Sequence, residues 1–189
     1  MTKRKTFLQG CNTTTMKLII FDGGPASGKS TLGALLTEKF CELGNKAILL
    51  DLDTYVEELN PKWIWTDNEK KKEDLLKARH DYLEDIRKYL QNDFIVIAIG
   101  ERFSAFLNGL TIINSVYLFH LRIPFSLRNQ RMRNRGQPLI DLGKDQKDRD
   151  EVKVLPGYLY ENVNSPEEDM LNLLRLIQTD QGLVNIKDD

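Results

Sequence analysis

An eight-residue segment near the start of the chain has the residue types and spacing of a phosphate-binding loop. The segment fits the pattern Gly, any four residues, Gly, Lys and then Ser or Thr, and it reads Gly23, Gly24, Pro25, Ala26, Ser27, Gly28, Lys29 and Ser30. Glycines allow positive φ angles, so that backbone N–H groups turn inward around a phosphate beside a helix N-terminus. The pattern therefore predicts a site for nucleotide phosphates.

Three side chains at the end of this loop have distinct expected roles. Lys29 supplies a mobile positive charge for the β and γ phosphates, and Ser30 has the small hydroxyl that ligates Mg²⁺ between them. Thr31 adds a hydroxyl for the α phosphate. The segment thus predicts binding of ATP with Mg²⁺. The alternative is a glycine-rich turn that only connects a strand to a helix.

The rest of the chain must supply the elements that position this loop. Apolar runs predict strands at residues 17–22, 46–52, 94–99, 115–121 and 157–163. Helical stretches separate them, as in βα units that build a parallel sheet covered on both faces. We therefore expect an α/β fold with a five-stranded parallel sheet and helices on both of its faces.

Helix signals fall between these strands. Helices are expected at residues 30–43, 69–91 and 124–135, and from 166 onward. Gly44 is placed to end the first of them and Ser165 to cap the last. A polar loop is expected between the third helix and the last strand. The long helix at 69–91 has an apolar stripe that we expect to be buried, formed by Leu75, Leu76, Tyr82, Leu83, Ile86 and Leu90.

Length and charge restrict the function classes. With 189 residues we expect one domain at 16–189, preceded by a flexible extension at 1–15. The 27 Lys and Arg residues face 28 Asp and Glu, and a net charge of −1 gives no overall field for a nucleic-acid polymer or an anionic membrane. No apolar run approaches the roughly 20 residues that a bilayer requires, and the start lacks the apolar core of a signal peptide. A cytoplasmic protein is expected.

Cysteine and histidine are scarce. The two cysteines, Cys11 and Cys41, do not have a zinc-ligand spacing. The two histidines, His80 and His120, are not beside a Ser or Cys at a recognisable catalytic spacing. The sequence therefore supports neither a structural metal nor histidine-based chemistry.

Residues 17–177 resemble the P-loop small-molecule kinases, which include nucleoside and nucleotide kinases, adenylylsulfate kinase and chloramphenicol phosphotransferase. The sequence has no Asn-Lys-x-Asp motif that reads guanine and no motor or transporter signature. The resemblance implies a three-layer P-loop NTPase fold with an arginine-rich lid at about residues 124–150. It also implies ATP and Mg²⁺ as cofactors and a small-molecule acceptor, and a homodimer is compatible with it.

The resemblance implies roles for two carboxylates after the second apolar run. In these kinases an acidic residue at the end of the second strand reaches the acceptor. Asp53 lies beyond the run, where the carboxyl ends of parallel strands face the ligand crevice, so we expect it to orient or deprotonate the acceptor hydroxyl. Asp51 is expected in the water shell of Mg²⁺. The alternative is that both carboxylates only cap the helical turn that follows.

A third segment of the resemblance ends the third predicted strand. Gly100-Glu101-Arg102-Phe103 is similar to Glu-Arg-Ser in deoxynucleoside kinases and to Asp-Arg-Tyr in thymidylate kinases. By that likeness Glu101 faces Mg²⁺ or its waters, and Arg102 faces the acceptor or the transferred phosphate. The alternative is an ordinary surface ion pair.

The lid segment is basic. Residues 122–149 contain eight Lys or Arg and three Asp, a net charge of +5. Their arginines resemble the lid of the same kinases, although Gln137 stands where deoxynucleoside kinases have Arg; they are Arg128, Arg131, Arg133 and Arg135. Lid arginines stabilise charge that spreads over the transferred phosphoryl group. We expect Arg131 and Arg135, one helical turn apart, to be catalytic, with Arg128 near the substrate and Arg133 in solvent. The alternative is a solvated basic helix.

Acceptor contacts are expected between the second strand and the long helix. Trp63 and Trp65 are predicted either to stack on a base or to close a small apolar lid. Arg79 and Tyr82 lie three residues apart and are predicted to reach the same crevice. The alternative for this pair is a solvated Arg beside a core-facing Tyr.

The function predicted from these features is transfer of the γ-phosphoryl group of ATP to a small molecule. A nucleoside or nucleotide is the favoured acceptor. Lys29, Asp53, Arg131 and Arg135 are the expected catalytic residues. The alternatives are a kinase of another metabolite or antibiotic, and a protein that binds a nucleotide as a regulatory ligand. Asp53 argues against the regulatory alternative.

Overall fold

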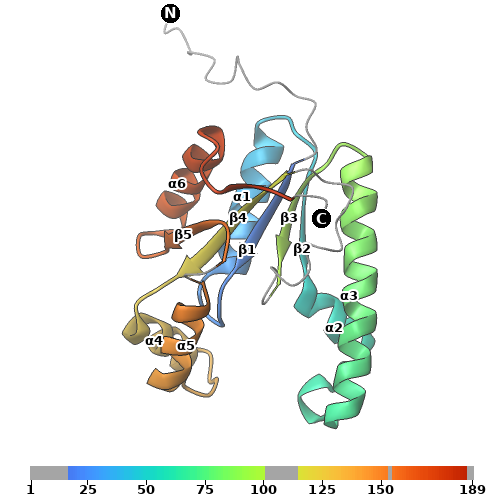
Figure 1. Cartoon of the computed structure of the whole chain (residues 1–189), viewed down its shortest axis with the longest axis vertical. Coiled ribbons are helices and arrows are strands. Elements are labelled where there is room, and N and C mark those ends of the chain that lie inside the picture. Colours follow the sequence, from blue (N-terminus) through green and yellow to red (C-terminus); the bar gives the residue numbers. More distant parts are fainter. Residues whose placement is uncertain (1–16, 101–114, 153–154, 187–189) are drawn as a thin grey trace, which may run out of the picture.

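A computed structural model describes residues 17–100, 115–152 and 155–186. Its central feature is one sheet in which five strands run parallel (Figure 1). In spatial order they are β2 (Ala47–Asp51), β3 (Ile95–Ile99), β1 (Leu18–Asp22), β4 (Ser115–Arg122) and β5 (Tyr158–Glu161). The expected α/β fold and its five parallel strands are confirmed. A short strand not predicted from the sequence, β6 (Leu183–Asn185), pairs antiparallel with β4.

Helices cover both faces of this sheet and make three layers. On β1, Leu18 and Ile20 belong to the core cluster under α3 (Asn68–Gln91), whereas Ile19 and Phe21 belong to the cluster under α1 (Lys29–Glu42) and α6 (Pro166–Gln178). Successive strand residues point to opposite faces, so a continuous apolar run is buried on both sides. Figure 1 shows α3 on one side of the sheet and α1 with α6 on the other.

Local signals set several helix ends as expected. Gly44 has a φ of 82° just beyond α1 and donates its N–H to the carbonyl of Cys41. The Ser165 hydroxyl caps α6 by accepting the N–H of Glu168 at 3.2 Å, and Pro166 occupies the first turn.

Two expectations about the elements are wrong. The expected polar loop contains α5 (Leu142–Val152). Residues 52–65, for which no element was predicted, form α2 (Leu52–Leu59) and the short 3₁₀ helix η1 (Trp63–Trp65). The second wrong expectation concerns the buried stripe of the long helix. In α3, Leu76 is 65% exposed, because the buried stripe runs through Asp74, Ala78 and Tyr82 instead.

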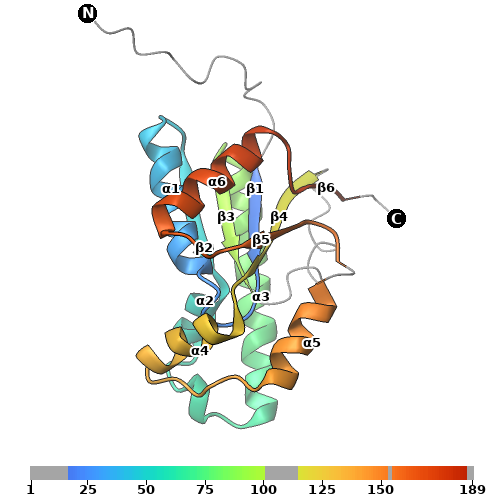
Figure 2. The same cartoon turned by 90° about the vertical axis from the view of Figure 1, so that its left-hand side faces the viewer.

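The helices that border the carboxyl ends of the strands form two groups. Figures 1 and 2 show α4 (Phe125–Asn134) and α5 at the same end of the molecule as α2 and the first turns of α3. The first group follows β4, and the second follows β2. In the described parts of the chain, none of the helices has the length and apolar character needed to cross a membrane.

Candidate functional site

The glycine-rich segment lies between β1 and α1 and bends sharply. The φ angle is 142° at Gly23, 60° at Ala26 and 99° at Gly28. A Cβ atom at Gly23 would lie 2.5 Å from the carbonyl oxygen of Leu121, and one at Gly28 would lie 2.2 Å from Nδ2 of Asn162. Both glycines are therefore required by backbone conformation and by close approach.

Each backbone carbonyl from Gly23 to Ser27 accepts a hydrogen bond from a side chain. Lys29 Nζ donates to Gly23 at 2.7 Å and to Gly24 at 3.3 Å, Arg128 Nε to Pro25 at 3.1 Å, Arg131 Nη1 to Ala26 at 3.3 Å and Asn162 Nδ2 to Ser27 at 2.6 Å. Carbonyl oxygens repel a phosphate. Because side-chain donors engage all five carbonyls, the loop becomes more favourable for an anion. The N-terminus of α1 has no side-chain cap, which leaves its positive end for the same anion.

Ser30 and Asp51 meet where the loop approaches the end of β2. Ser30 Oγ donates to Asp51 Oδ2 at 3.1 Å, and Asp51 Oδ1 caps α2 by accepting the N–H of Asp53 at 3.1 Å. One carboxylate thus combines the helix cap with a contact to the predicted metal ligand. Mg²⁺ prefers oxygen ligands and is usually held by one or two carboxylates together with substrate phosphates. Across residues 17–100, 115–152 and 155–186, three or more metal-ligating side chains do not cluster, and the Ser30–Asp51 pair fits a metal bound in that way.

Asp53 is exposed in the first turn of α2, so its carboxylate is accessible to an acceptor.

Tyr82 and Arg79, on α3, differ from their predicted roles. The buried hydroxyl of Tyr82 donates to the carbonyl of Ile99 at 2.9 Å. Burial and the nearby Asp51 carboxylate raise the pKa of Tyr82 well above its usual range. Tyr82 is therefore a core residue, as the alternative interpretation held, and it does not reach the crevice. Arg79 is half-buried rather than solvated, and burial lowers the pKa of its guanidinium.

Arginines of α4 lie against the phosphate loop. Arg128 is only 5% exposed, and its Nη1 donates to Oδ1 of Asp145 on α5 at 2.9 Å. A Cβ atom at Gly24 would lie 1.9 Å from Nη2 of Arg128, so the guanidinium rests directly on the loop. Arg131 is half-buried, whereas Arg133 and Arg135 are exposed at the end of the helix. The structure thus brings Arg128 and Arg131 to the loop, and the catalytic pairing of Arg131 with Arg135 stays a prediction.

The remaining predicted contacts lie at the acceptor side. Trp63 is half-buried and packs against the core cluster under α3, with Nζ of Lys71 5.7 Å from the centre of its ring. This favours packing over an open stacking platform. Glu101 and Arg102, as well as the predicted extension at residues 1–15, lie outside the described residues.

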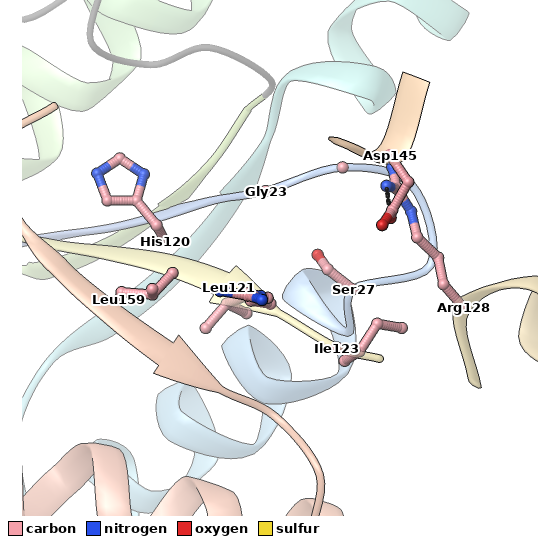
Figure 3. Close-up of a pocket in the computed structure, with 10 residues that line it drawn as sticks. Gly23, Ser27, His120, Leu121, Ile123, Arg128, Asp145 and Leu159 are labelled. Carbon is pink, nitrogen blue, oxygen red and sulfur yellow. Dashed lines mark hydrogen bonds and ion pairs between the residues drawn. The ribbon is translucent and has the colours of Figure 1, made fainter. Parts of the chain in front are cut away.

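Three polar residues near the loop were missed by the sequence reasoning: Asp22, His120 and Asn162. All three are buried. A cavity of about 50 Å³ is lined by His120 together with Ser27, Arg128 and Asp145. Figure 3 draws these residues around the loop. A polar residue at the carboxyl end of an apolar run is the signal that the three share, and it points to the ligand edge of a parallel sheet.

One family model matches part of the chain. The family is described as chromatin associated protein KTI12, and its model matches residues 16–100, which include the phosphate loop and the first three strands. None of the curated proteins matches the sequence significantly.

Solved structures of P-loop kinases are similar over most of the chain. Shikimate kinase from Acinetobacter baumannii, in complex with shikimate, is 21% identical with a TM-score of 0.59 and covers 89% of this chain and 96% of its own. APS kinase from Mycobacterium tuberculosis, in complex with AMPPNP and APS, is 16% identical with a TM-score of 0.60 and covers 86% and 97%. A sugar kinase from a Janibacter species is 16% identical with a TM-score of 0.58 and covers 86% and 94%. The chain has the P-loop kinase fold, as its resemblance to the small-molecule kinases implied.

Proposed function

We propose that the chain is an ATP- and Mg²⁺-dependent kinase that phosphorylates a hydroxyl group of a small molecule, with nucleosides and nucleotides as the first acceptors to test. The observation that carries the proposal is the contact between Ser30 and Asp51, because it joins the phosphate loop to the end of β2. One oxygen of Asp51 caps α2, but a loop that only connected β1 to α1 would need no contact with the other oxygen. The two groups provide oxygen ligands beside a helix N-terminus suited to phosphates.

The donor side would act mainly by neutralising charge. The ammonium of Lys29 donates to the carbonyls of Gly23 and Gly24, and from there it would reach the β and γ phosphates of bound ATP. Arg131, which donates to the loop carbonyl of Ala26, would contact the transferred group. Arg135 would contact the same group when the lid closes. When bound, Mg²⁺ would supply positive charge to the phosphates, and we propose that Ser30 would hold it, with Asp51 and Glu101 binding its waters.

The acceptor side would supply the base. Asp53 takes the proton of the acceptor hydroxyl while that oxygen forms its bond to the γ phosphorus. The bond from the γ phosphorus to the β–γ bridging oxygen breaks, and ADP leaves with the electron pair. Positioned acid–base groups of this kind contribute about 10²- to 10⁴-fold in rate. Trp63, Arg79 and Arg102 are proposed to contact the acceptor.

A regulatory nucleotide-binding protein is the second candidate. It is favoured by the match of residues 16–100 to a family described as chromatin associated. That match ends before α4, which carries Arg128 and Arg131. Transfer to an acceptor requires these lid arginines to approach the phosphates, whereas binding alone requires only the loop.

Formation of ADP in the presence of candidate acceptors tests the proposal. The full chain is incubated with ATP, Mg²⁺ and, separately, nucleosides, nucleoside monophosphates, sugars, and aminoglycoside or phenicol antibiotics. We expect one class to stimulate ADP formation strongly, and Lys29→Ala to remove the stimulation. Tight binding of ATP without stimulation by any class would favour the regulatory candidate.

A further inference from the structure

A chain of hydrogen bonds runs behind the phosphate loop and ends at Lys29. The carbonyl of Pro156 lies 2.7 Å from Nε2 of His120, and Nδ1 of His120 lies 3.1 Å from Oδ2 of Asp22. Asp22 Oδ1 accepts the N–H of Gly23 at 2.7 Å. The carbonyl of Gly23 in turn accepts Nζ of Lys29 at 2.7 Å. The loop that precedes β5 is therefore connected to the ammonium group that would contact the phosphates.

The partners of His120 determine its protonation. A carbonyl oxygen accepts hydrogen bonds only, so Nε2 must carry a proton to bond Pro156. The ionised carboxylate of Asp22 can only accept hydrogen bonds, at Oδ1 from the N–H of Gly23 and at Oδ2 from the ring, so Nδ1 must also donate. Both ring nitrogens are donors only in the imidazolium form. His120 is 2% exposed, and a buried cation is tolerated there because the buried Asp22 carboxylate lies beside it.

The charged surroundings of His120 come from four elements. Asp22 lies on β1, Arg122 on β4, Arg128 on α4 and Asp145 on α5, and the last three line the same cavity as His120. Arg128 and Asp145 form an ion pair with each other at 2.9 Å, and Arg122 approaches Glu161 at 3.4 Å. Asp22 is therefore the carboxylate that is directly paired with His120.

We propose that His120, in its doubly protonated form, is a positioning residue of the nucleotide site. It holds Asp22 against the N–H of Gly23 and thereby fixes the Asp22–Gly23 peptide, which directly precedes the Gly23 carbonyl that accepts a hydrogen bond from Lys29. This inference rests on the proposed nucleotide site but not on transfer to an acceptor. Loss of the proton removes one of the two donors, so the ring can keep its hydrogen bond to Asp22 or to Pro156 but not both. In either case the chain of hydrogen bonds that supports the first peptide of the loop is broken.

The direction of the pH effect follows from the protonated state that is required. Burial lowers the pKa of His120, but the hydrogen bonds to Asp22 and Pro156 outweigh burial and raise it above the ordinary 6.5. The contribution of the pair is therefore fully present below pH 6.5 and is lost as the pH rises through the raised pKa. Nucleotide binding should weaken on the alkaline side.

Binding of AMPPNP with Mg²⁺, measured by calorimetry from pH 6 to pH 9, tests the proposal without any phosphoryl transfer. Ionisation of the nucleotide itself is common to all variants, so the comparison is between variants at each pH. We expect the ratio of the parent's affinity to the affinity of His120→Gln to fall about tenfold from pH 6 to pH 9. This is the size of effect that loss of a charged hydrogen bond predicts. His80→Gln is the matched control, because His80 is exposed on α3 and its ring pairs with the neighbouring Asp81 at the surface. Parallel profiles for the parent and His120→Gln would overturn the proposal.

A second measurement decides the matter if His120→Gln fails to fold or if the chain does not bind AMPPNP. Nuclear magnetic resonance of the two histidine rings in the full chain gives the pKa of each. We expect His120 to titrate above 6.5 and to titrate at lower pH in Asp22→Asn, with His80 unchanged. An unchanged His120 titration in Asp22→Asn would contradict the pairing. Failure of AMPPNP binding alone would instead count against the proposed function.

Discussion

The proposed site has a donor side, formed by the phosphate loop with α4 and α5, and an acceptor side, formed by α2, η1 and the first turns of α3. The two sides differ in how their polar groups are held. On the donor side, Arg128, Asp145 and Asn162 are all buried and bonded to the loop or to one another. On the acceptor side, Asp53 is exposed, and Ile64 in η1 is 75% exposed. Buried polar groups are costly unless every partner is present. The donor side is therefore built for one fixed ligand geometry, whereas the acceptor side leaves its chemistry at the surface.

The largest expected effect comes from removing the charge inside the loop. Lys29→Ala should lower ATP turnover about 10³-fold, which corresponds to about 4 kcal/mol of transition-state stabilisation. Lys39→Ala is the matched control on the same helix, since Lys39 pairs with Glu42 at the surface. Steady-state ADP formation measures both. Equal turnover in Lys29→Ala and Lys39→Ala would show that the donor site lies elsewhere.

A comparable effect on stability is expected from the buried ion pair between α4 and α5. Asp145 is 3% exposed, so Asp145→Ala leaves the charge of Arg128 buried and should cost about 3 kcal/mol in the free energy of unfolding. Removing both charges in Arg128→Met with Asp145→Ala should restore much of that loss. Urea unfolding measures each, with the exposed Asp150→Asn as control. If the double variant is no more stable than Asp145→Ala, the pair is not coupled.

The acceptor side should separate binding from transfer. Asp53→Asn should lower phosphoryl transfer about 10²-fold while the affinity for AMPPNP changes little, because the base is lost and the loop is untouched. Glu57→Gln, an exposed carboxylate one turn further along α2, is the control. Single-turnover transfer and calorimetric binding are the two measurements. Transfer at the parental rate in Asp53→Asn would assign the base to another residue.

The smallest effect should come from the aromatic residue at the acceptor edge. Trp63→Ala should raise the KM for the acceptor a few-fold, about 1 kcal/mol or less, and leave the KM for ATP unchanged. The neighbouring Ile64→Ala is the control, because Ile64 is exposed. A change in the KM for ATP alone would mean that Trp63 serves the donor side, and the contrast between the two sides would be lost.

Local patterns predicted the sheet and the loop because their signals lie within a few residues. The runs at 17–22 and 94–99 became adjacent strands, and Gly23 and Gly28 of the loop have the positive φ angles that glycine allows. Gly44 and Ser165 ended and began helices for equally local reasons. Where conformation depends on neighbours in the chain, the sequence was sufficient.

The errors arise where a charged residue is buried by a distant partner. Among the side chains of α5 that the structure describes, the buried one is Asp145, which is satisfied by Arg128 on α4. In α3, Asp74 is buried through Asn60 and Lys70, which shifts the buried face away from Leu76. A hydrophobic pattern cannot register such pairs.

The hydrogen bonds that hold the phosphate loop could not be predicted for the same reason. Asn162 and Ser27 are 135 residues apart, and His120 and Asp22 are 98 residues apart. Only the fold brings them together, so their positions near the ends of apolar runs indicate the ligand edge of the sheet but not these particular contacts. The predicted roles of Ser30 and Asp51 depend on the ends of β1 and β2, which the sheet topology brings to one edge.

The most direct test of the central claim is to follow the phosphorus of ATP itself. Phosphorus-31 magnetic resonance of ATP and Mg²⁺ with the full chain and an accepted substrate distinguishes transfer from hydrolysis. If the chain is a kinase, we expect the γ resonance to be replaced by that of a phosphate ester on the acceptor. Lys29→Ala should prevent this change. Release of inorganic phosphate alone, or an unchanged γ resonance in the presence of bound ATP, would contradict it.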